Sequence, residues 1–203
     1  MHAIPYSGAC LLFEPRPDQA RKLRDMFMEA AVVEQVALSD TTGRVDLRTP
    51  RAAGPLSTIE PRNRLDHAAE VDVIRVPTRR LDEYARHTFG FIKIDVEGHE
   101  EAVLRGALEI LRRDLPSLLI EIEERHNPGA LERVPALLAS FDYQGFFLHE
   151  NRLRALAEFN LSTMQRSENI SGGKKLGLYV NNFLFVQAER RRRLRRWLSD
   201  SVV

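Results

Sequence analysis

Residues 91–107 read FIKIDVEGHEEAVLRGA, a short apolar run followed by a longer amphipathic stretch. The run from Phe89 to Val96 has the length and the β-branched residues of a strand. From His99 to Arg113, apolar residues recur at helical spacing, which predicts one helix. Gly98 lies between the two and predicts a tight turn, where a ligand can approach the backbone. The local order is therefore strand, turn and helix.

Outside this stretch, short apolar runs alternate with amphipathic segments, which is typical of α/β proteins. Residues 44–65 show no convincing periodicity, and we interpret them as a long surface excursion. The last two apolar runs have no helix between them, which favours antiparallel pairing. Strands are predicted at residues 9–13, 32–38, 118–123, 143–149 and 178–187, weaker strands around 45–47 and 71–76, and helices at 17–30 and 131–141.

Charged residues alternate with apolar ones in two of the predicted strands. Lys93, Asp95 and Glu97 alternate with isoleucine and valine, and Glu121 and Glu123 repeat the pattern in the next strand. In open α/β sheets, ligands bind beyond the carboxyl ends of the strands, so these carboxylates are candidate site residues. Two structural explanations stand beside this one: an edge strand with its charged face in water, or an architectural ion pair between Lys93 and Glu121.

Two further residues have weaker signals. Glu14 follows an early strand at the head of a helix, where nucleoside-binding folds bond ribose hydroxyls, although acidic residues also favour helix N-termini. His99 lies near the strand ends, and because histidine titrates near neutrality it is a candidate general base. An exposed histidine in the first helical turn is the alternative. No nucleophile-elbow motif for Ser-His-Asp chemistry occurs, and the histidines show no metal-ligand spacing.

The composition is that of a folded protein of one domain. The 203 residues carry 30 Lys and Arg against 29 Asp and Glu, a net charge of +1, and 43% of them are hydrophobic. This balance excludes a protein built globally to bind polyanions, and no apolar run is long enough to cross a bilayer. The single cysteine, Cys10, excludes an intramolecular disulfide framework and a cysteine-clustered zinc site. Because no signal-peptide pattern occurs, we expect a cytoplasmic protein.

Residues 189–203 differ from the rest of the chain by the basic run Arg190–Arg196. We expect residues 1–188 to form the domain and residues 189–203 to form a basic helix or tail. The run suits weak contact with an anionic membrane surface, but its few apolar residues also fit a solvated terminal helix. No nucleic-acid partner is expected.

The stretch at 91–107 resembles the signature of the FkbM family of S-adenosylmethionine-dependent methyltransferases. Supporting segments follow in the family's order. Residues 12–17 (LFEPRP) resemble its second-strand motif, and residues 36–40 (VALSD) with Gly43 resemble its third. Residues 77–82 (PTRRLD) resemble the lead-in to the signature, residues 119–121 (LIE) the fifth strand, and residues 182–185 (NFLF) the last strand.

This resemblance implies an α/β fold of the class I methyltransferase type, a Rossmann-like sheet that is mostly parallel with an antiparallel C-terminal strand. The implied cofactor is S-adenosylmethionine, and the implied reaction is O-methylation of a hydroxyl group on a sugar, glycan or secondary metabolite. A small molecule or glycan would be the acceptor. The catalytic candidates are Asp95, Glu97, His99 and Glu121, and the cofactor-binding candidates are Glu14, Pro15, Ala37, Leu38 and Asp95.

The family normally begins with a strand and a glycine-rich loop that holds the methionine part of the cofactor, whereas this sequence begins after that point. We therefore expect the first, central strand of the sheet to be missing and the chain as written to bind S-adenosylmethionine weakly. The alternative function is a catalytically inactive, truncated methyltransferase-like domain that acts as a binding module. Another nucleoside-binding α/β enzyme is less well supported, because no phosphate-cradling loop occurs.

Overall fold

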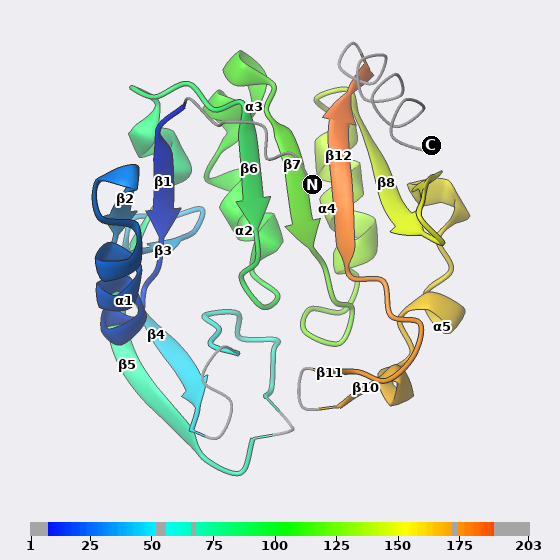
Figure 1. The fold of residues 1–203 in the computed structure, drawn as a ribbon, viewed down its shortest axis with the longest axis horizontal. Helices are drawn as coiled ribbons and strands as arrows, with labels where there is room; N and C mark the ends of the chain where they lie inside the picture. Colours follow the sequence, from blue (N-terminus) through cyan, green and yellow to red (C-terminus); the bar gives the residue numbers. More distant parts are fainter. Residues whose placement is uncertain (1–7, 52–55, 66–67, 172–173, 189–203) are drawn as a thin grey trace.

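A computed structural model gives the fold and describes residues 8–51, 56–65, 68–171 and 174–188 (Figure 1). The basic run at 190–196, for which a helix or tail is predicted, lies outside these residues. The boundary between residues 188 and 189 therefore stays a prediction. In the described part of the chain, no helix is both long and apolar enough to cross a membrane.

The largest sheet has five strands in the order β6, β7, β12, β8 and β9. β6 (Phe91–Ile94) and β7 (Ser117–Glu121) are parallel. β12 (Asn182–Gln187) runs antiparallel to both of its neighbours, β7 and β8 (Tyr143–His149). β8 and β9 (Arg152–Ala155) form an antiparallel hairpin. The prediction of antiparallel pairing near the end of the chain is confirmed.

The prediction of a mostly parallel sheet is confirmed only in part, because the described sheets are mixed. One reason lies in the turn between β8 and β9, where Glu150 and Asn151 have φ values of 50° and 58°. Two successive left-handed residues make a two-residue hairpin turn, which reverses the chain at once. Parallel pairing would need a long crossover connection instead, so these two strands are antiparallel.

β1 (Cys10–Phe13) and β2 (Ala31–Glu34) form a separate parallel pair, connected through α1 (Pro17–Phe27). β1 lies beside β6 in Figure 1 and points in the same direction. Among the residues that the structure describes, however, no strand pairing joins β1 to β6. The carboxyl ends of β1, β6 and β7 therefore face the same side of the molecule without a continuous ladder of hydrogen bonds between them.

The predicted strand at 32–38 is two strands in different sheets. Its first part belongs to β2, and its last part is β3 (Ala37–Leu38), which pairs in parallel with β5 (Val71–Arg79). β4 (Gly43–Pro50) completes this sheet antiparallel to β5, so both weaker predicted strands are present and longer than predicted. A short antiparallel pair, β10 (Ile170–Ser171) and β11 (Lys174–Lys175), lies before β12.

The predicted helix at 99–113 is interrupted in its middle. α2 (Glu100–Arg105) ends before Gly106, and α3 (Leu108–Asp114) begins after Ala107. The Asp82 carboxylate accepts hydrogen bonds of 3.1 Å from the backbone N–H groups of Glu109 and Ile110. The first N–H groups of a helix have no partner within it, so Asp82 stabilises a second helix start. The prediction of a single helix is therefore wrong.

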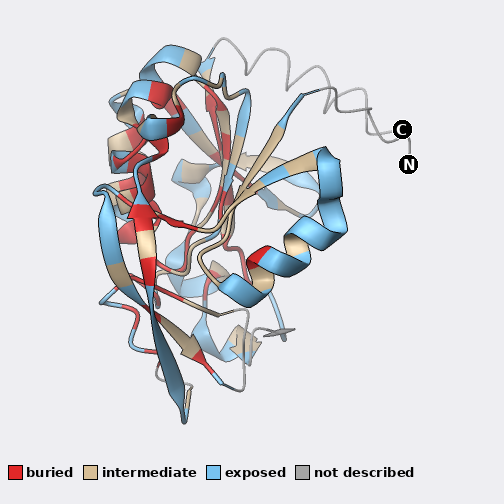
Figure 2. Cartoon of the chain, turned by 90° about the vertical axis from the view of Figure 1, so that its left-hand side faces the viewer, coloured by how far each residue is buried: buried red, intermediate tan, exposed pale blue. Residues whose placement is uncertain are grey.

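Helices cover both sides of the strands. α2, α3 and α4 (Ala130–Ala139) lie on one face of the large sheet, and α1 lies on the opposite side (Figures 1 and 2). Figure 2 shows α1 as a mostly exposed helix, and Ala20 is its one fully buried residue. The main core includes Phe147, Phe183 and Phe185, each at most 1% exposed. The remaining helical segments are α5 (Leu161–Met164) and single turns at 28–30, 81–84, 156–158 and 167–169.

The interpretation of residues 44–65 as a surface excursion is wrong for the part from 58 to 65. Thr58, Ile59, Glu60, Asn63 and Leu65 are each at most 8% exposed. Ile59 joins a second, smaller core with residues of β3, β4 and β5. The polar members bond to the turn after β6. This segment lacks periodicity because its polar side chains are buried by hydrogen bonding rather than by packing along one face of a helix or strand.

Candidate functional site

Charged side chains gather where β6 and β7 end. Lys93 Nζ lies 3.3 Å from Asp95 Oδ2 and 3.9 Å from Glu121 Oε2, so one ammonium group joins the ends of both strands. The ion pair of Lys93 with Glu121 is therefore present, and β6 is an edge strand of the described five-stranded sheet. Both structural explanations apply to Lys93. Neither explanation accounts for the carboxyl groups of Glu97 and Glu123, which are more buried than Lys93.

Glu97 and Glu123 lie on either side of the His126 ring. Glu97 Oε2 is 3.1 Å from His126 Nδ1, and Glu123 Oε2 is 3.8 Å from His126 Nε2. The side chains of Glu97, Glu123 and His126 are 15%, 4% and 7% exposed. Glu97 comes from the turn after β6, and the other two come from the segment after β7. The parallel pairing of these strands therefore brings the three side chains together.

Glu123 is held in its ionised form. Burial raises the pKa of Glu123, but a hydrogen bond from Arg125 and its positive charge lower it. His126 and Tyr179 lower it further, so the pKa of Glu123 lies below its usual value. Tyr179 Oη donates to Glu123 at 2.8 Å, and Asn181 Nδ2 donates at 3.0 Å. The same Asn181 nitrogen lies 2.7 Å from Glu121 Oε1, so the amide links the half-buried carboxylate of Glu121 to the buried one of Glu123.

Glu97 has the opposite balance of forces. Burial raises its pKa, and the negative charges of Asp95, Glu123 and Glu121 raise it further, to about 8. Glu97 therefore keeps its proton at neutral pH and loses it in mildly alkaline solution. A carboxyl group with this pKa, in contact with an imidazole, is suited to accept a proton from the hydroxyl group of a ligand.

His99 points toward other partners. Its Nε2 atom lies 2.9 Å from Ser39 Oγ, and its Nδ1 atom lies 3.1 Å from Glu60 Oε2. Each ring nitrogen thus already has a protein partner, and both partners are buried. The imidazole joins the turn after β6 to the end of β3 and to the segment at 58–65. This geometry favours a structural role for His99 over that of a general base.

Glu100, which follows His99, is a buried carboxyl group whose pKa makes the stability of the protein depend on pH. It is 2% exposed, and its Oε2 atom has no hydrogen-bond partner among the described residues. Burial raises the pKa of Glu100 from 4.5 to about 7. The unfolded chain therefore releases this proton at a lower pH than the folded protein does. As a result, the free energy of unfolding falls as pH rises from about 4.5 to about 7.

We predict that E100Q removes this pH dependence. Relative to the wild type, its free energy of unfolding should rise by on the order of 3 kcal/mol across that interval. The measurement is urea unfolding at about pH 4 and about pH 8, which lie on either side of the interval. E109Q, which alters an exposed glutamate on α3, is the control. A stability difference between E100Q and wild type that is equal at both pH values would contradict the prediction.

The cofactor-binding candidates lie at the ends of β1 and β3. Glu14 continues from β1, where its N–H donates to the Glu34 carbonyl at 3.0 Å and its Oε1 atom accepts from the Arg16 N–H at 2.8 Å. Burial raises the pKa of Glu14. Ala37 is 6% exposed and packs in the smaller core, while Leu38 is half-buried against the main core. Pro15 is also half-buried, beside Glu14.

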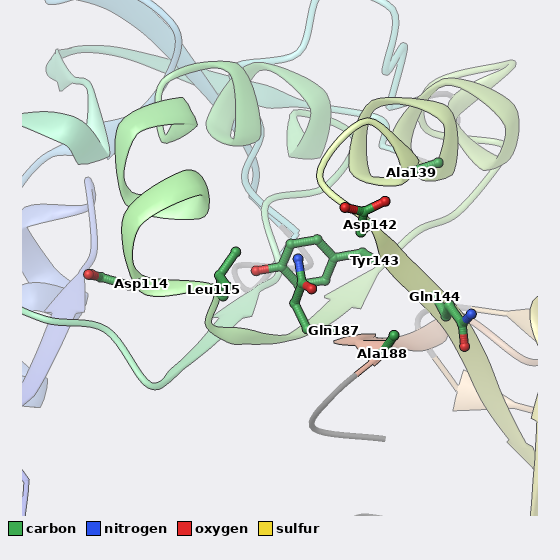
Figure 3. Close-up of a pocket in the computed structure, with 8 residues that line it drawn as sticks. All are labelled: Asp114, Leu115, Ala139, Asp142, Tyr143, Gln144, Gln187 and Ala188. Carbon is green, nitrogen blue, oxygen red and sulfur yellow. The ribbon is translucent and has the colours of Figure 1, made fainter. Parts of the chain in front are cut away.

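A cavity of about 700 Å³ lies elsewhere, at the opposite ends of the strands (Figure 3). Its lining includes Leu115 before β7, Tyr143 at the start of β8, and Gln187 at the end of β12. It borders Ala188, where the described chain stops. The carboxylate cluster is therefore not part of this cavity. None of the predicted site residues lines the cavity.

Sequence reasoning missed three residues of the cluster. His126 follows β7 by a few residues, and the rule that ligands bind beyond strand ends could have included it. Tyr179 and Asn181 precede β12, which is antiparallel, so its beginning lies beside the ends of β6 and β7. Their role depends on that pairing, and no local pattern marks them. In the described part of the chain, no group of three or more His, Cys, Asp or Glu residues is arranged to hold a metal.

Comparison with known proteins adds two findings. The sequence pattern of the methyltransferase FkbM domain matches residues 2–148. A crystal structure of methyltransferase FkbM from Methylobacillus flagellatus KT is similar, with 18% sequence identity and a TM-score of 0.50 over 86% of this chain. The chain covers 36% of that protein, about a third of its length, and at this identity the likeness concerns the fold alone. No curated protein matches the chain.

Proposed function

The chain belongs to the FkbM methyltransferase family, and from this we propose that it transfers a methyl group from S-adenosylmethionine to a hydroxyl group of a small molecule or glycan. The observation that carries the proposal is the contact between Glu97, whose pKa is about 8, and His126 beyond the ends of β6 and β7. The proposal also includes the class I arrangement of the sheet, in which β1, β6 and β7 present their carboxyl ends to the ligands.

Glu97 is the proposed proton acceptor. A neutral hydroxyl is a poor nucleophile, so transfer needs a group that removes its proton as the new bond forms. Above pH of about 8, Glu97 is ionised and can take that proton, while His126 Nδ1 at 3.1 Å stabilises its position. Asp95 and Glu121 are more accessible, with side chains 48% and 25% exposed, and would orient the acceptor by accepting hydrogen bonds from its other hydroxyls.

The residues at the ends of β1, β3, β6 and β7 also fit the ribose, the adenine and the sulfonium charge of the cofactor. When bound, S-adenosylmethionine supplies a methyl group whose carbon bonds to the acceptor oxygen as its bond to sulfur breaks, leaving a thioether. Glu14 presents a carboxylate at the end of β1, and one oxygen, Oε1, is held by the Arg16 N–H. Such a carboxylate can accept hydrogen bonds from the two hydroxyls of a ribose. Leu38 would lie against the adenine, and the negative charges of Asp95 and Glu121 suit a cationic sulfonium.

The test of this proposal is binding followed by turnover. Because the sequence predicts weak binding, we would titrate S-adenosylhomocysteine against the purified full chain by ligand-observed NMR, which detects weak complexes. Methyl transfer from radiolabelled S-adenosylmethionine is then assayed over a panel of sugars, glycans and hydroxylated small molecules. Saturable binding with labelled product supports the proposal. Binding without product from any acceptor would favour the inactive binding module.

Glu14 gives a specific prediction for cofactor affinity. E14Q keeps the shape of the side chain but loses the charge that strengthens hydrogen bonds to ribose hydroxyls. We expect the affinity for S-adenosylhomocysteine to fall about 10- to 100-fold, the usual value of a hydrogen bond to a charged group. The same NMR titration measures it. E29Q, an exposed position just after α1, should bind as the wild type does. Equal affinities of E14Q and E29Q would contradict the assignment of Glu14.

A further inference from the structure

The turn that carries Glu97 has an unusual backbone. Glu97 has φ = 53° and Gly98 has φ = 105°, so two successive residues are outside the region that side chains prefer. Glycine adopts this conformation freely, but for glutamate it is uncommon and costs free energy. A Cβ atom on Gly98 would also lie 3.1 Å from the His126 carbonyl oxygen, so the turn packs directly on the backbone of His126. Other contacts must hold it there.

Two buried side chains bond to this turn from the segment at 58–63. Thr58 Oγ1 and Asn63 Nδ2 each donate a hydrogen bond of 2.9 Å to the Glu97 carbonyl oxygen. Thr58 is 1% exposed and Asn63 is 3% exposed. Both lone pairs of a single carbonyl are therefore taken up by side chains that lie more than thirty positions earlier in the sequence. The next carbonyl, that of Gly98, accepts a bond of 2.8 Å from Asn127 Nδ2.

The segment at 58–63 is itself fixed at several points. Thr58 exchanges both backbone hydrogen bonds with Arg48 of β4, each 3.0 Å long. Arg48 Nη2 donates to the Asn63 carbonyl at 2.8 Å. Glu60, which lies between the two donors, contacts the imidazole of His99 just after the turn. Bonds to β4 and to His99 thus fix the positions of the two donors, and through them the position of the turn.

We propose that Thr58 and Asn63 are positioning residues, which hold the Glu97 carbonyl and thereby keep the Glu97 carboxyl group against His126. Neither side chain contacts the reacting atoms; they act through the backbone of Glu97. The inference rests on the proposed function in one respect, that Glu97 is the proton acceptor. Its structural part, the dependence of the contact between Glu97 and His126 on two distant donors, can be tested without any methyl transfer.

The test combines substitutions at both donors. T58A and N63A each remove one of the two donors to the Glu97 carbonyl and leave that carbonyl one partner, so each single variant should fold. T58A also removes the acceptor of the Glu60 N–H, and N63A removes that of the Leu65 N–H. T58A/N63A leaves a buried carbonyl without these partners and should release the turn. T58S keeps the hydroxyl and should behave as the wild type does. T49A is the matched control: it removes a hydroxyl of β4 that lies 2.9 Å from Ser57 Oγ and leaves both donors to the Glu97 carbonyl in place.

The readout is the histidine ring, followed by long-range ¹H–¹⁵N NMR of the full chain, with the His126 signals assigned from H126Q. We expect the double variant to shift the His126 ring nitrogens toward those of a free imidazole, while T58S and T49A leave them unchanged. If the wild type transfers methyl groups, the double variant should lower kcat about 100-fold, the cost of misplacing a reacting group. Its KM for the cofactor should stay the same.

Each outcome decides the question. A folded double variant with unchanged His126 signals overturns the inference, whatever the activity. If the double variant fails to fold, T58A and N63A decide the question. Each has lost one donor and should shift the His126 ring nitrogens relative to T58S, so unchanged signals in both overturn the inference. A His126 shift in a protein that transfers no methyl group supports the positioning by Thr58 and Asn63 and counts against the proposed function. The experiment therefore distinguishes a failure of the positioning by Thr58 and Asn63 from a failure of the proposed function.

Discussion

Replacing Glu97 by glutamine is expected to slow methyl transfer about 100- to 10,000-fold, the usual contribution of a general base. The glutamine has nearly the same shape and can keep a contact with His126, but it cannot take a proton from the acceptor. In the wild type, kcat should rise with pH and level off above about 8, because Glu97 must be ionised to act. E97Q should lose this rise together with the rate. The measurement is initial-rate transfer of labelled methyl over the pH range.

The control for this prediction is E132Q, which neutralises an exposed glutamate on α4. It should keep the rate and the pH profile of the wild type. The histidine NMR spectrum of E97Q should also stay that of a folded protein. If E97Q retains the wild-type rate, the proton acceptor is one of the accessible carboxylates, Asp95 or Glu121. D95N and E121Q would then separate the two.

The part of the site that lies on one strand and its turn is predictable from the sequence. Asp95 and Glu97 break the apolar pattern of a strand at its carboxyl end. This break indicates a site, because open α/β sheets bind ligands beyond the carboxyl ends of their parallel strands. Glu121 follows from the same rule on the next strand. The sequence cannot show which of these groups is buried. Burial depends on residues from other parts of the chain, such as Tyr179 and Asn181, which precede the antiparallel strand β12. Both bond to Glu123, and Asn181 also bonds to Glu121.

The segment at 58–65 shows the opposite case. Its residues obey no period, because Thr58 and Asn63 are buried to satisfy a single carbonyl on another element. Periodicity detects packing along a face, and it does not detect polar side chains that bond to a distant backbone. The break between α2 and α3 was missed for a similar reason. The apolar spacing continues across Gly106, while the Asp82 carboxylate that begins the second helix comes from a residue far earlier in the chain.

The second large effect is expected in the core, where Phe183→Ala should lower the free energy of unfolding by about 3–5 kcal/mol. Phe183 is 0% exposed on β12, the middle strand of the five-stranded sheet. Its ring meets that of Phe159 edge to face, with centroids 5.1 Å apart. Alanine leaves a cavity in this layer and removes the aromatic pair. Since a domain of this kind is stable by only about 5–15 kcal/mol, the loss takes a large share of the total.

Urea unfolding followed by circular dichroism measures this loss, and two variants frame it. F183L keeps most of the volume and should lose less than about 1.5 kcal/mol. L148A removes a side chain that is 59% exposed on β8, and its stability should change little. If F183A lost no more stability than L148A, β12 would not be packed as the structure places it.

The same variants ask whether β12 serves the site as well as the core. Asn181 and Asn182 directly precede Phe183 and donate to the Glu121 carboxylate, and Asn181 also donates to Glu123. If F183A acts through global stability alone, its methyl-transfer rate should fall only by the fraction of unfolded chains at the assay temperature. A larger fall, with F183L close to the wild type, would mean that the packing of Phe183 also fixes the start of the strand. The carboxylates beyond β7 would then depend on a ring that never touches them.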